Sequence, residues 1–334
     1  MNKSGYLYFY DEKAEYSQLL HLTTLCASIV FKKLYLCVSE PYFKFFNSRC
    51  QLPDNVNVYC VNAEELHSTM LTRLDSLYES RIIRSNCPPV ERHCINRWLF
   101  LKGRNFFNEE SLFAIDWDTL VFPGLKSYET HLRGIDLAAT NLMKLGWEGA
   151  PNEPIWSLCP NLLFLSKISL DCYIQYLNKY ITYSEKGLSI VAGLFCDMQP
   201  WSSVISSSLV KKSNLRLLDF NDINTHLALV DHNVRIIADC GLQFKEMRYY
   251  FAKGTQTYLE TPYLRAKHLV FTDDGRPYFV IRNKSHYYQP PYLQEAAAIH
   301  FSGVEGKQLL FQSFIEDISN YLKTHLSIAK VTMP

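Results

Sequence analysis

The chain has 334 residues, an apolar content of 48% and a formal net charge of +1 from 34 basic and 33 acidic residues. This balance argues against a nucleic-acid-binding protein, which usually carries a basic stripe. We expect no signal peptide or transmembrane segment, because the apolar stretch before Asp11 is short and no uninterrupted apolar run approaches about eighteen residues. None of the 10 cysteines has Cys-x-x-Cys spacing, which argues against a zinc or redox site and favours a reducing, cytoplasmic location.

The opening third of the chain has the pattern of alternating strands and helices. Apolar runs predict strands at 6–10, 34–38 and 56–61, and leucines at near-helical spacing predict a helix over 16–31. A second helix is expected to begin at 63–66. This order is typical of a parallel sheet. Neither a Gly-x-Gly-x-x-Gly loop nor a Walker lysine loop is present, so neither a dinucleotide enzyme nor a P-loop NTPase is supported.

A helix rich in arginine and aromatic residues is predicted over 90–107, after a break at Pro88-Pro89. Its Arg97 and Trp98 precede the next strand by about one helix length, so we expect the helix to pack beside that strand. One of its arginines could then reach a phosphate or a sugar. The alternative is an amphipathic helix whose basic side chains are solvated on its outer face.

The next strand ends at two carboxylates. An apolar run over 112–115 predicts a strand buried on both faces, and Asp116 and Asp118 follow it on one face of an extended backbone. Open α/β sheets place their ligands at the carboxyl ends of strands. Carboxylate oxygens there suit Mg²⁺ or Mn²⁺ with a phosphate-bearing substrate. The alternative is that Asp116 begins a turn and Asp118 is a solvated loop residue.

Further strands, a helix and a hairpin follow in the second half. The strands are predicted at 135–140 and 161–165, the helix at 170–181, and the hairpin strands at 268–271 and 278–281. Asp197 fits an N-cap position before another helix, with Pro200 in its first turn.

Near the C-terminus, an apolar run at 296–300 ends in His300, and Phe-Ser-Gly-Val-Glu-Gly-Lys follows up to Lys307. Histidine is a regular ligand of Mn²⁺-type ions. Gly303 and Gly306 let the backbone pass close to a ligand, and Lys307 supplies a point charge of the kind that holds a diphosphate. A lone histidine is more often structural, but the whole combination at a strand end is more specific.

Together, Ile115 to Asp118 and His300 to Lys307 resemble the bipartite metal and diphosphate signature of GT-A-fold glycosyltransferases. The resemblance implies an α/β fold: a GT-A-like single domain over 1–334, with a Rossmann-like, mixed and mostly parallel central sheet flanked by helices. A nucleotide-binding half would span 1–124 and end in the metal motif. An acceptor-binding half would span 125–334 and carry the C-terminal motif.

The resemblance also implies an activity and ligands. The chain would transfer a sugar from a nucleotide-sugar donor, with a UDP-sugar favoured, while Mn²⁺ or Mg²⁺ bridges the diphosphate. Asp118 and His300 would ligate the metal, and Asp116 would contact the metal or the ribose. Lys307 would hold the diphosphate, with Gly303 close to it. The acceptor would be a glycan, a lipid-linked glycan or a protein.

Roles for several other residues follow from the same resemblance. Asp197 would be the general base in an inverting enzyme or would orient the donor in a retaining one; the alternative is a capping residue. Arg97 resembles a basic residue that reaches the donor, and Trp201 could stack on a sugar. Three aromatic residues of the first strand are candidates for contact with the base: Tyr8, Phe9 and Tyr10.

Two other classes of function stay open. A metal-dependent nucleotidyltransferase or phosphoesterase usually needs more carboxylates or histidines for two metals, whereas the C-terminal cluster offers one histidine and one lysine. A non-catalytic nucleotide-sugar-binding module would be expected to lose its metal ligands first, yet they are intact.

Overall fold

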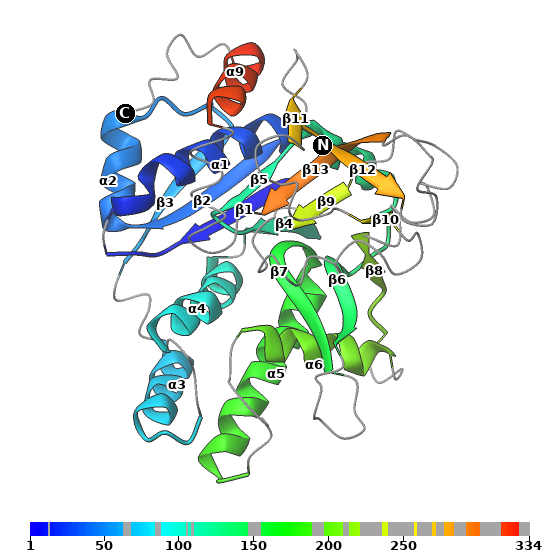
Figure 1. Ribbon diagram of the computed structural model, residues 1–334. Helices are drawn as coiled ribbons and strands as arrows, with labels where there is room; N and C mark the ends of the chain where they lie inside the picture. Colours follow the sequence, from blue (N-terminus) through cyan, green and yellow to red (C-terminus); the bar gives the residue numbers. More distant parts are fainter. Residues whose placement is uncertain are drawn as a thin grey trace.

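The computed structural model describes residues 1–12, 14–62, 68–83, 88–104, 106–107, 110–145, 155–188, 197–209, 214–220, 236–239, 257–258, 269–271, 277–283, 292–300 and 315–326. Within these ranges the chain builds a larger and a smaller sheet, with helices against both faces of the larger one (Figure 1). None of the helices in these ranges combines the length and the apolarity needed to cross a membrane.

The main sheet has seven strands and is mixed but mostly parallel. Its strands are β1 (Ser4–Phe9), β2 (Lys33–Ser39), β3 (Val56–Val61), β4 (Ser111–Ile115), β6 (Leu137–Leu145), β7 (Ile155–Ser166) and β8 (Leu217–Asp219). They lie in the order β3-β2-β1-β4-β7-β6-β8, and only β7 runs antiparallel to its neighbours. The predicted α/β class, with a mostly parallel sheet flanked by helices, is confirmed.

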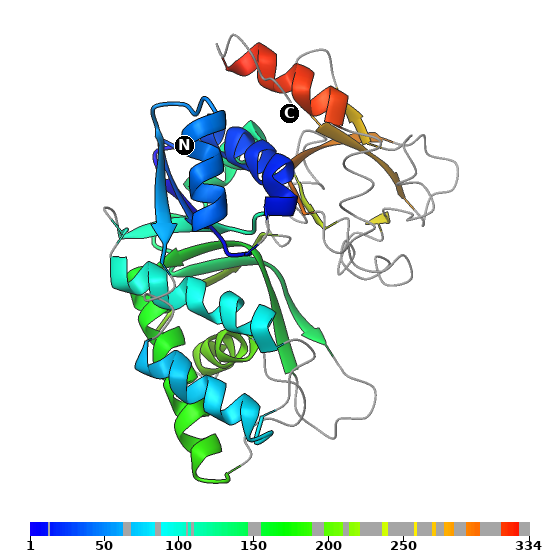
Figure 2. The ribbon, with the colours of Figure 1, turned by 90° about the vertical axis from the view of Figure 1, so that its left-hand side faces the viewer.

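Helices cover both faces of this sheet. They are α1 (Ser17–Val30), α2 (Glu40–Arg49), α3 (Thr69–Glu79), α4 (Pro88–Arg104), α5 (Lys167–Glu185) and α6 (Met198–Leu209), with 3-10 turns η1 (Ala14–Tyr16) and η3 (Pro123–Thr130). A further helix, α9 (Ile315–His325), lies against α1. Alternation along β1 sends Tyr6 and Tyr8 into the core beneath α3 to α6, and Leu7 and Phe9 into the core beneath α1 and α2. Figure 2 shows the two groups of helices on opposite sides of the sheet.

The smaller sheet joins the middle of the chain to its C-terminal part. Its strands are β5 (Thr119–Val121), β9 (Ile236–Asp239), β10 (Thr257–Tyr258), β11 (Leu269–Phe271), β12 (Pro277–Asn283) and β13 (Tyr292–His300). The antiparallel β11–β12 pair is the predicted hairpin. β13 pairs with β5 in a register that sets His300 opposite Thr119. The strand after the two aspartates therefore brings the C-terminal histidine to them.

Several predicted boundaries differ from those of the structure. α4 begins at Pro88 and ends at Arg104 rather than spanning 90–107, and β7 is longer than the predicted 161–165. The helix start expected at 63–66 lies outside the described residues; α3 begins after Ser68, whose hydroxyl accepts a hydrogen bond of 3.3 Å from the Leu71 N–H. One helix, α2, was not expected from the sequence; it begins with Pro41 in its first turn.

Candidate active site

A tight turn between β4 and β5 presents the two aspartates. The Asp116 N–H donates to the Asn161 carbonyl of β7 at 2.8 Å, and the Thr119 N–H donates to the Asp116 carbonyl at 3.0 Å. The Thr23 hydroxyl of α1 donates to the Trp117 carbonyl at 2.7 Å, which holds the middle of the turn. Asp116 thus does begin a turn, as the alternative interpretation had it, but Asp118 is buried rather than solvated.

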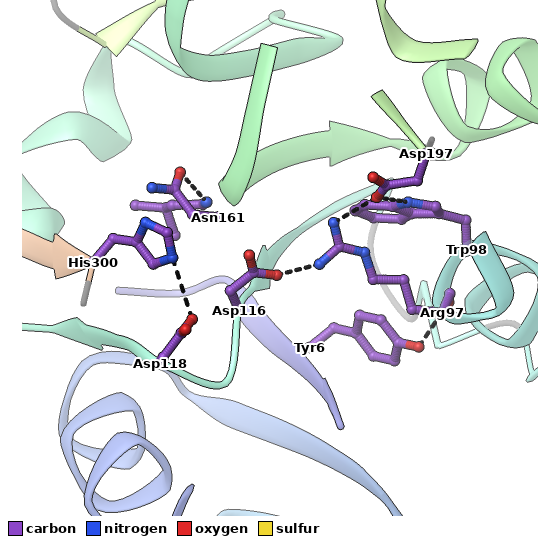
Figure 3. A network of polar contacts seen from close by, with 9 residues as sticks. Tyr6, Arg97, Trp98, Asp116, Asp118, Asn161, Asp197 and His300 are labelled. Carbon is purple, nitrogen blue, oxygen red and sulfur yellow. Dashed lines mark hydrogen bonds and ion pairs between the residues drawn. The ribbon is translucent and has the colours of Figure 1, made fainter. Parts of the chain in front are cut away.

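Asp116, Asp118 and His300 form a compact group of possible metal ligands. Each offers one ligand atom, and these atoms all lie within 4.8 Å of one another. His300 Nε2 lies 3.3 Å from Asp118 Oδ1, and both side chains are buried (Figure 3). Two carboxylate oxygens and one imidazole nitrogen form a donor set that Mn²⁺ or Mg²⁺ accepts. The residues present therefore fit a divalent cation.

The electrostatics of Asp116 agree with such a cation. Burial raises the pKa of the Asp116 carboxyl, and the nearby Asp118 carboxylate raises it further, whereas Arg97 and His300 act in the opposite direction. Two carboxylates held this close repel each other, and a bound cation relieves that repulsion.

Arg97 of α4 links the metal group to Asp197. One Nη atom pairs with Asp116 Oδ1, and the other donates to Asp197 Oδ2 at 2.9 Å (Figure 3). Burial by itself would lower the pKa of the Arg97 guanidinium, but the two carboxylates outweigh burial and raise it. The predicted alternative, a solvated basic side chain, is wrong for Arg97, because its exposed fraction is only 8%.

Two hydrogen bonds with β1 fix the position of α4, and with it the position of Arg97. The Tyr6 hydroxyl donates to the Arg97 carbonyl at 2.8 Å, and the Asn96 amide donates to the Tyr8 hydroxyl at 2.7 Å. All four residues are buried. Hydrogen bonds of this kind are enthalpically strong in a low-dielectric interior, so the strand fixes the helix and the helix fixes the guanidinium.

Asp197 lies directly before α6, as predicted, and its side chain is turned to α4. Asp197 Oδ2 accepts hydrogen bonds from Arg97 and, at 3.3 Å, from the Trp98 indole N–H. Trp201, one turn further along α6, is fully buried and packs edge-on against Trp98, with ring centroids 5.2 Å apart. The predicted sugar stacking on Trp201 is therefore wrong, because its ring belongs to the core.

Glu91 is a neighbour of this group that the sequence analysis did not select. It lies in the first turn of α4, half-buried, where burial and the nearby Asp197 carboxylate raise the pKa of its carboxyl. Its position six residues before Arg97, with Cys94 between them, puts the three on one side of the helix. That spacing was the available signal, but an acidic residue in a first helical turn is also common at solvated helix ends.

The aromatic residues of β1 divide between core and site edge. Tyr8 and Phe9 are buried in the two cores, so they are not available to a base and that part of the prediction is wrong. Tyr10 is half-buried and stacks on His93 with ring centroids 4.3 Å apart. Its contact with a base stays a prediction. Lys307 and Gly303 lie outside the described residues.

No profile of a known protein family matches the chain, and no curated protein matches its sequence. Solved glycosyltransferases are similar to it in structure. The galactosyltransferase LgtC, crystallised with donor and acceptor sugar analogues, gives a TM-score of 0.49 at 10% identity and covers 99% of this chain and 98% of its own.

Two further solved structures cover less of the chain. The glycosyltransferase GlyE of Streptococcus pneumoniae TIGR4 gives a TM-score of 0.37 at 14% identity, over 69% of this chain and 48% of its own. Mouse xyloside xylosyltransferase 1 gives 0.39 at 10% identity, over 66% and 85%.

Proposed function

We propose that the chain is a metal-dependent glycosyltransferase that moves a sugar from a nucleotide-sugar donor, a UDP-sugar, to a hydroxyl-bearing acceptor. The main support is the meeting of Asp116 and Asp118, which follow β4, with His300, at the end of β13, in one compact group of which Asp118 and His300 are buried. The carboxyl end of β4 is also where an open α/β sheet is expected to bind its ligand.

In the proposed enzyme each of the three side chains contributes one ligand atom to the metal. Asp116, Asp118 and His300 would hold Mn²⁺ or Mg²⁺, which when bound supplies positive charge to the diphosphate that leaves as the glycosidic bond breaks. The protein's part is to fix these three donors, which the β4–β5 turn and the β5–β13 pairing do. Lys307 and Gly303 stay proposed contacts of the diphosphate.

Arg97 and Asp197 are suited to hold the sugar that is transferred. The buried Arg97 Nε atom has no hydrogen-bond partner among the described residues, so it can donate to a sugar hydroxyl. Asp197 Oδ2 already accepts two hydrogen bonds, which makes this carboxylate a better orienting group than a proton acceptor. We therefore place Asp197 on the donor sugar as a catalytic residue and favour orientation over general-base catalysis.

The same observations weigh against the alternative enzyme class. A two-metal phosphoesterase or nucleotidyltransferase needs more ligands than one group supplies. In the part of the chain that the structure describes, Asp116, Asp118 and His300 are the one group of three possible ligands. The acceptor is proposed as a glycan, a lipid-linked glycan or a protein.

Calorimetric titration of UDP, GDP and CMP, with and without Mn²⁺, tests the proposal. We expect UDP to bind only with the metal, and Asp118→Asn and His300→Ala to abolish that binding. Asp54→Asn and His131→Ala are matched controls, because both residues are exposed and lie outside the ligand group. Nucleotide binding that ignores the metal and both site variants would contradict a shared metal and diphosphate site.

A second measurement separates an enzyme from a binding module. Purified chain incubated with Mn²⁺ and a panel of UDP-sugars should release UDP slowly by hydrolysis, and the sugar with the fastest release identifies the donor. Metal-dependent UDP binding without release from any nucleotide sugar, in the presence of glycan acceptors, would favour the non-catalytic module.

A further inference from the structure

The turn from Asp116 to Thr119 carries both aspartates of the candidate metal group. The Thr119 N–H donates to the Asp116 carbonyl at 3.0 Å, so Trp117 and Asp118 are the central residues of a β-turn. The bond that closes the turn does not involve the central peptide group, whose carbonyl belongs to Trp117 and whose N–H belongs to Asp118. The orientation of this central peptide group therefore depends on contacts outside the turn.

The orientation of the central peptide group affects the direction in which the Asp118 side chain leaves the turn. Type I and type II turns share the closing hydrogen bond, but in type II the central peptide is turned over and φ of the third residue changes from about −90° to about +80°. In the part of the chain that the structure describes, Arg81 is the one residue other than glycine with a positive φ, so this turn is not of type II. A turned-over peptide would change the backbone at Asp118 and with it the direction of the carboxylate.

A hydroxyl group of α1 holds the central peptide group from outside. Thr23 is fully buried, and its hydroxyl donates to the Trp117 carbonyl at 2.7 Å. Helix α1 also packs against β5, the strand that follows the turn. Because a peptide group is planar, a fixed carbonyl oxygen also fixes the N–H of Asp118. The Trp117 ring supports the same arrangement, since its centroid lies 4.5 Å from that of Phe9 and 4.8 Å from that of Tyr16.

Asp118 depends on this support because its partner in the ligand group comes from the other sheet. Asp118 Oδ1 lies 3.3 Å from Nε2 of His300, which ends β13. The two side chains meet only if the turn presents the carboxylate in the right direction. Groups that orient a metal ligand without touching the metal are important for binding, and loss of one typically lowers metal affinity by about 10–100-fold.

We infer that Thr23 is a positioning residue of the candidate metal site: its hydroxyl holds the central peptide group so that the Asp118 carboxylate stays beside His300. The inference rests on the proposed function in one respect, because it takes Asp116, Asp118 and His300 as the metal ligands. Thr23 is not itself a ligand. It acts on the metal through the backbone of the turn, so its effect should be visible in metal affinity without any sugar transfer.

The next residue of α1, Thr24, provides a matched control. It is also fully buried, and its hydroxyl also donates over 2.7 Å, but to the Leu20 carbonyl of its own helix. Valine has nearly the shape of threonine without the hydroxyl, so Thr23→Val and Thr24→Val each remove one buried donor. Only Thr23→Val removes a bond to the turn that carries the aspartates. Thr23→Ser keeps the hydroxyl and loses a methyl group.

The experiment titrates wild type and the three variants with Mn²⁺ alone and follows the electron paramagnetic resonance signal of the free ion. We expect Thr23→Val to raise the Kd for Mn²⁺ about tenfold, and Thr23→Ser and Thr24→Val to stay within about twofold of wild type. Circular dichroism and urea unfolding of each metal-free chain show that the compared proteins are folded.

The outcomes separate this inference from the proposed function. Wild-type affinity in Thr23→Val, or an equal loss in Thr24→Val, overturns the role of Thr23 while the proposed function stands. If Thr23→Val does not fold, Thr23→Ser decides, because an affinity loss of about tenfold in a variant that keeps the hydroxyl contradicts the inference. A wild-type chain that binds no Mn²⁺ overturns the metal-dependent function, and the role of Thr23 with it. The expected affinities in a chain that transfers no sugar overturn the proposed transfer alone.

Discussion

Arg97 joins three separate parts of the chain through one buried guanidinium. It reaches Asp116 at the end of β4 and Asp197 at the start of α6 from the middle of α4. A planar fork with fixed N–H directions can serve two carboxylates at once, whereas a lysine would offer a single point charge. The guanidinium also lies 4.4 Å from the centroid of its neighbour Trp98. The position therefore favours arginine for its geometry as well as for its charge.

Removal of this cation should destabilise the fold strongly. Arg97→Met leaves the buried Asp197 and the half-buried Asp116 without their shared partner, and loss of one side of a buried ion pair typically costs about 3–5 kcal/mol. Urea unfolding at pH 7.5 would measure the loss. Lys44→Met, which breaks an exposed pair with Glu40 on α2, should cause no measurable change. An Arg97 variant within about 1 kcal/mol of wild type would show that the carboxylates are solvated or protonated.

The three possible metal ligands could be selected from the sequence because their signals are local. Two carboxylates after an apolar run, and a histidine at the end of another, are visible without knowledge of the fold. Sequence patterns fail where a side chain has two possible environments. Trp201 is an aromatic residue one turn beyond a site residue, but only tertiary packing decides that its ring lies in the core.

At the scale of elements, β5 determines where His300 lies. This strand is three residues long and follows the aspartate turn directly. Its partner β13 comes from the far end of the chain, so no local pattern announces the pairing. The α4 prediction succeeded for the opposite reason, because a helix of 17 residues carries its own periodicity. Long-range strand pairing is the part of the site that the sequence did not reveal.

The contact between α1 and α2 contains a histidine that should control stability in acid. His21 of α1 has an exposed fraction of 8%, and its ring meets Phe45 and Phe46 of α2 edge-on at 6.4 Å and 6.0 Å. Its buried Nε2 atom has no hydrogen-bond partner among the described residues. Burial lowers the pKa of the His21 imidazole from 6.5 to about 4, because the charged form loses its hydration in the folded chain.

The unfolded chain therefore binds a proton at His21 that the folded chain rejects. In the window from pH 6.5 down to about 4, the unfolded state holds more protons, so stability falls as the pH falls. Between pH 7.5 and pH 5 this residue should account for a loss of about 2 kcal/mol. Urea unfolding at both pH values should show a smaller loss for His21→Leu than for wild type. His131→Leu, at an exposed position, should leave the loss unchanged, and an equal loss in all three chains would contradict the assignment.

At the scale of the whole molecule, the candidate metal group lies where the two sheets meet. Asp116 and Asp118 belong to the turn that leaves the main sheet, and His300 belongs to β13 of the smaller sheet. Protons and a cation compete for the carboxylate oxygens and the imidazole nitrogen of this group. A ligand held by both sheets should therefore stabilise the entire fold rather than one element.

Thermal unfolding with Mn²⁺ and UDP would detect this linkage. A ligand that binds only the folded chain adds about 2.7 kcal/mol to the free energy of unfolding at a concentration of about 100 times its Kd. Wild type should melt at a higher temperature with Mn²⁺ and UDP and return to its original value after a chelator is added. Asp118→Asn should show no shift, whereas Asp54→Asn should behave as wild type.

The raised pKa of Asp116 makes this shift in melting temperature depend on pH. Because protons compete with the cation for this carboxyl, the shift should become smaller as the pH is lowered. A shift of equal size in Asp118→Asn, or one independent of pH, would place the cation elsewhere.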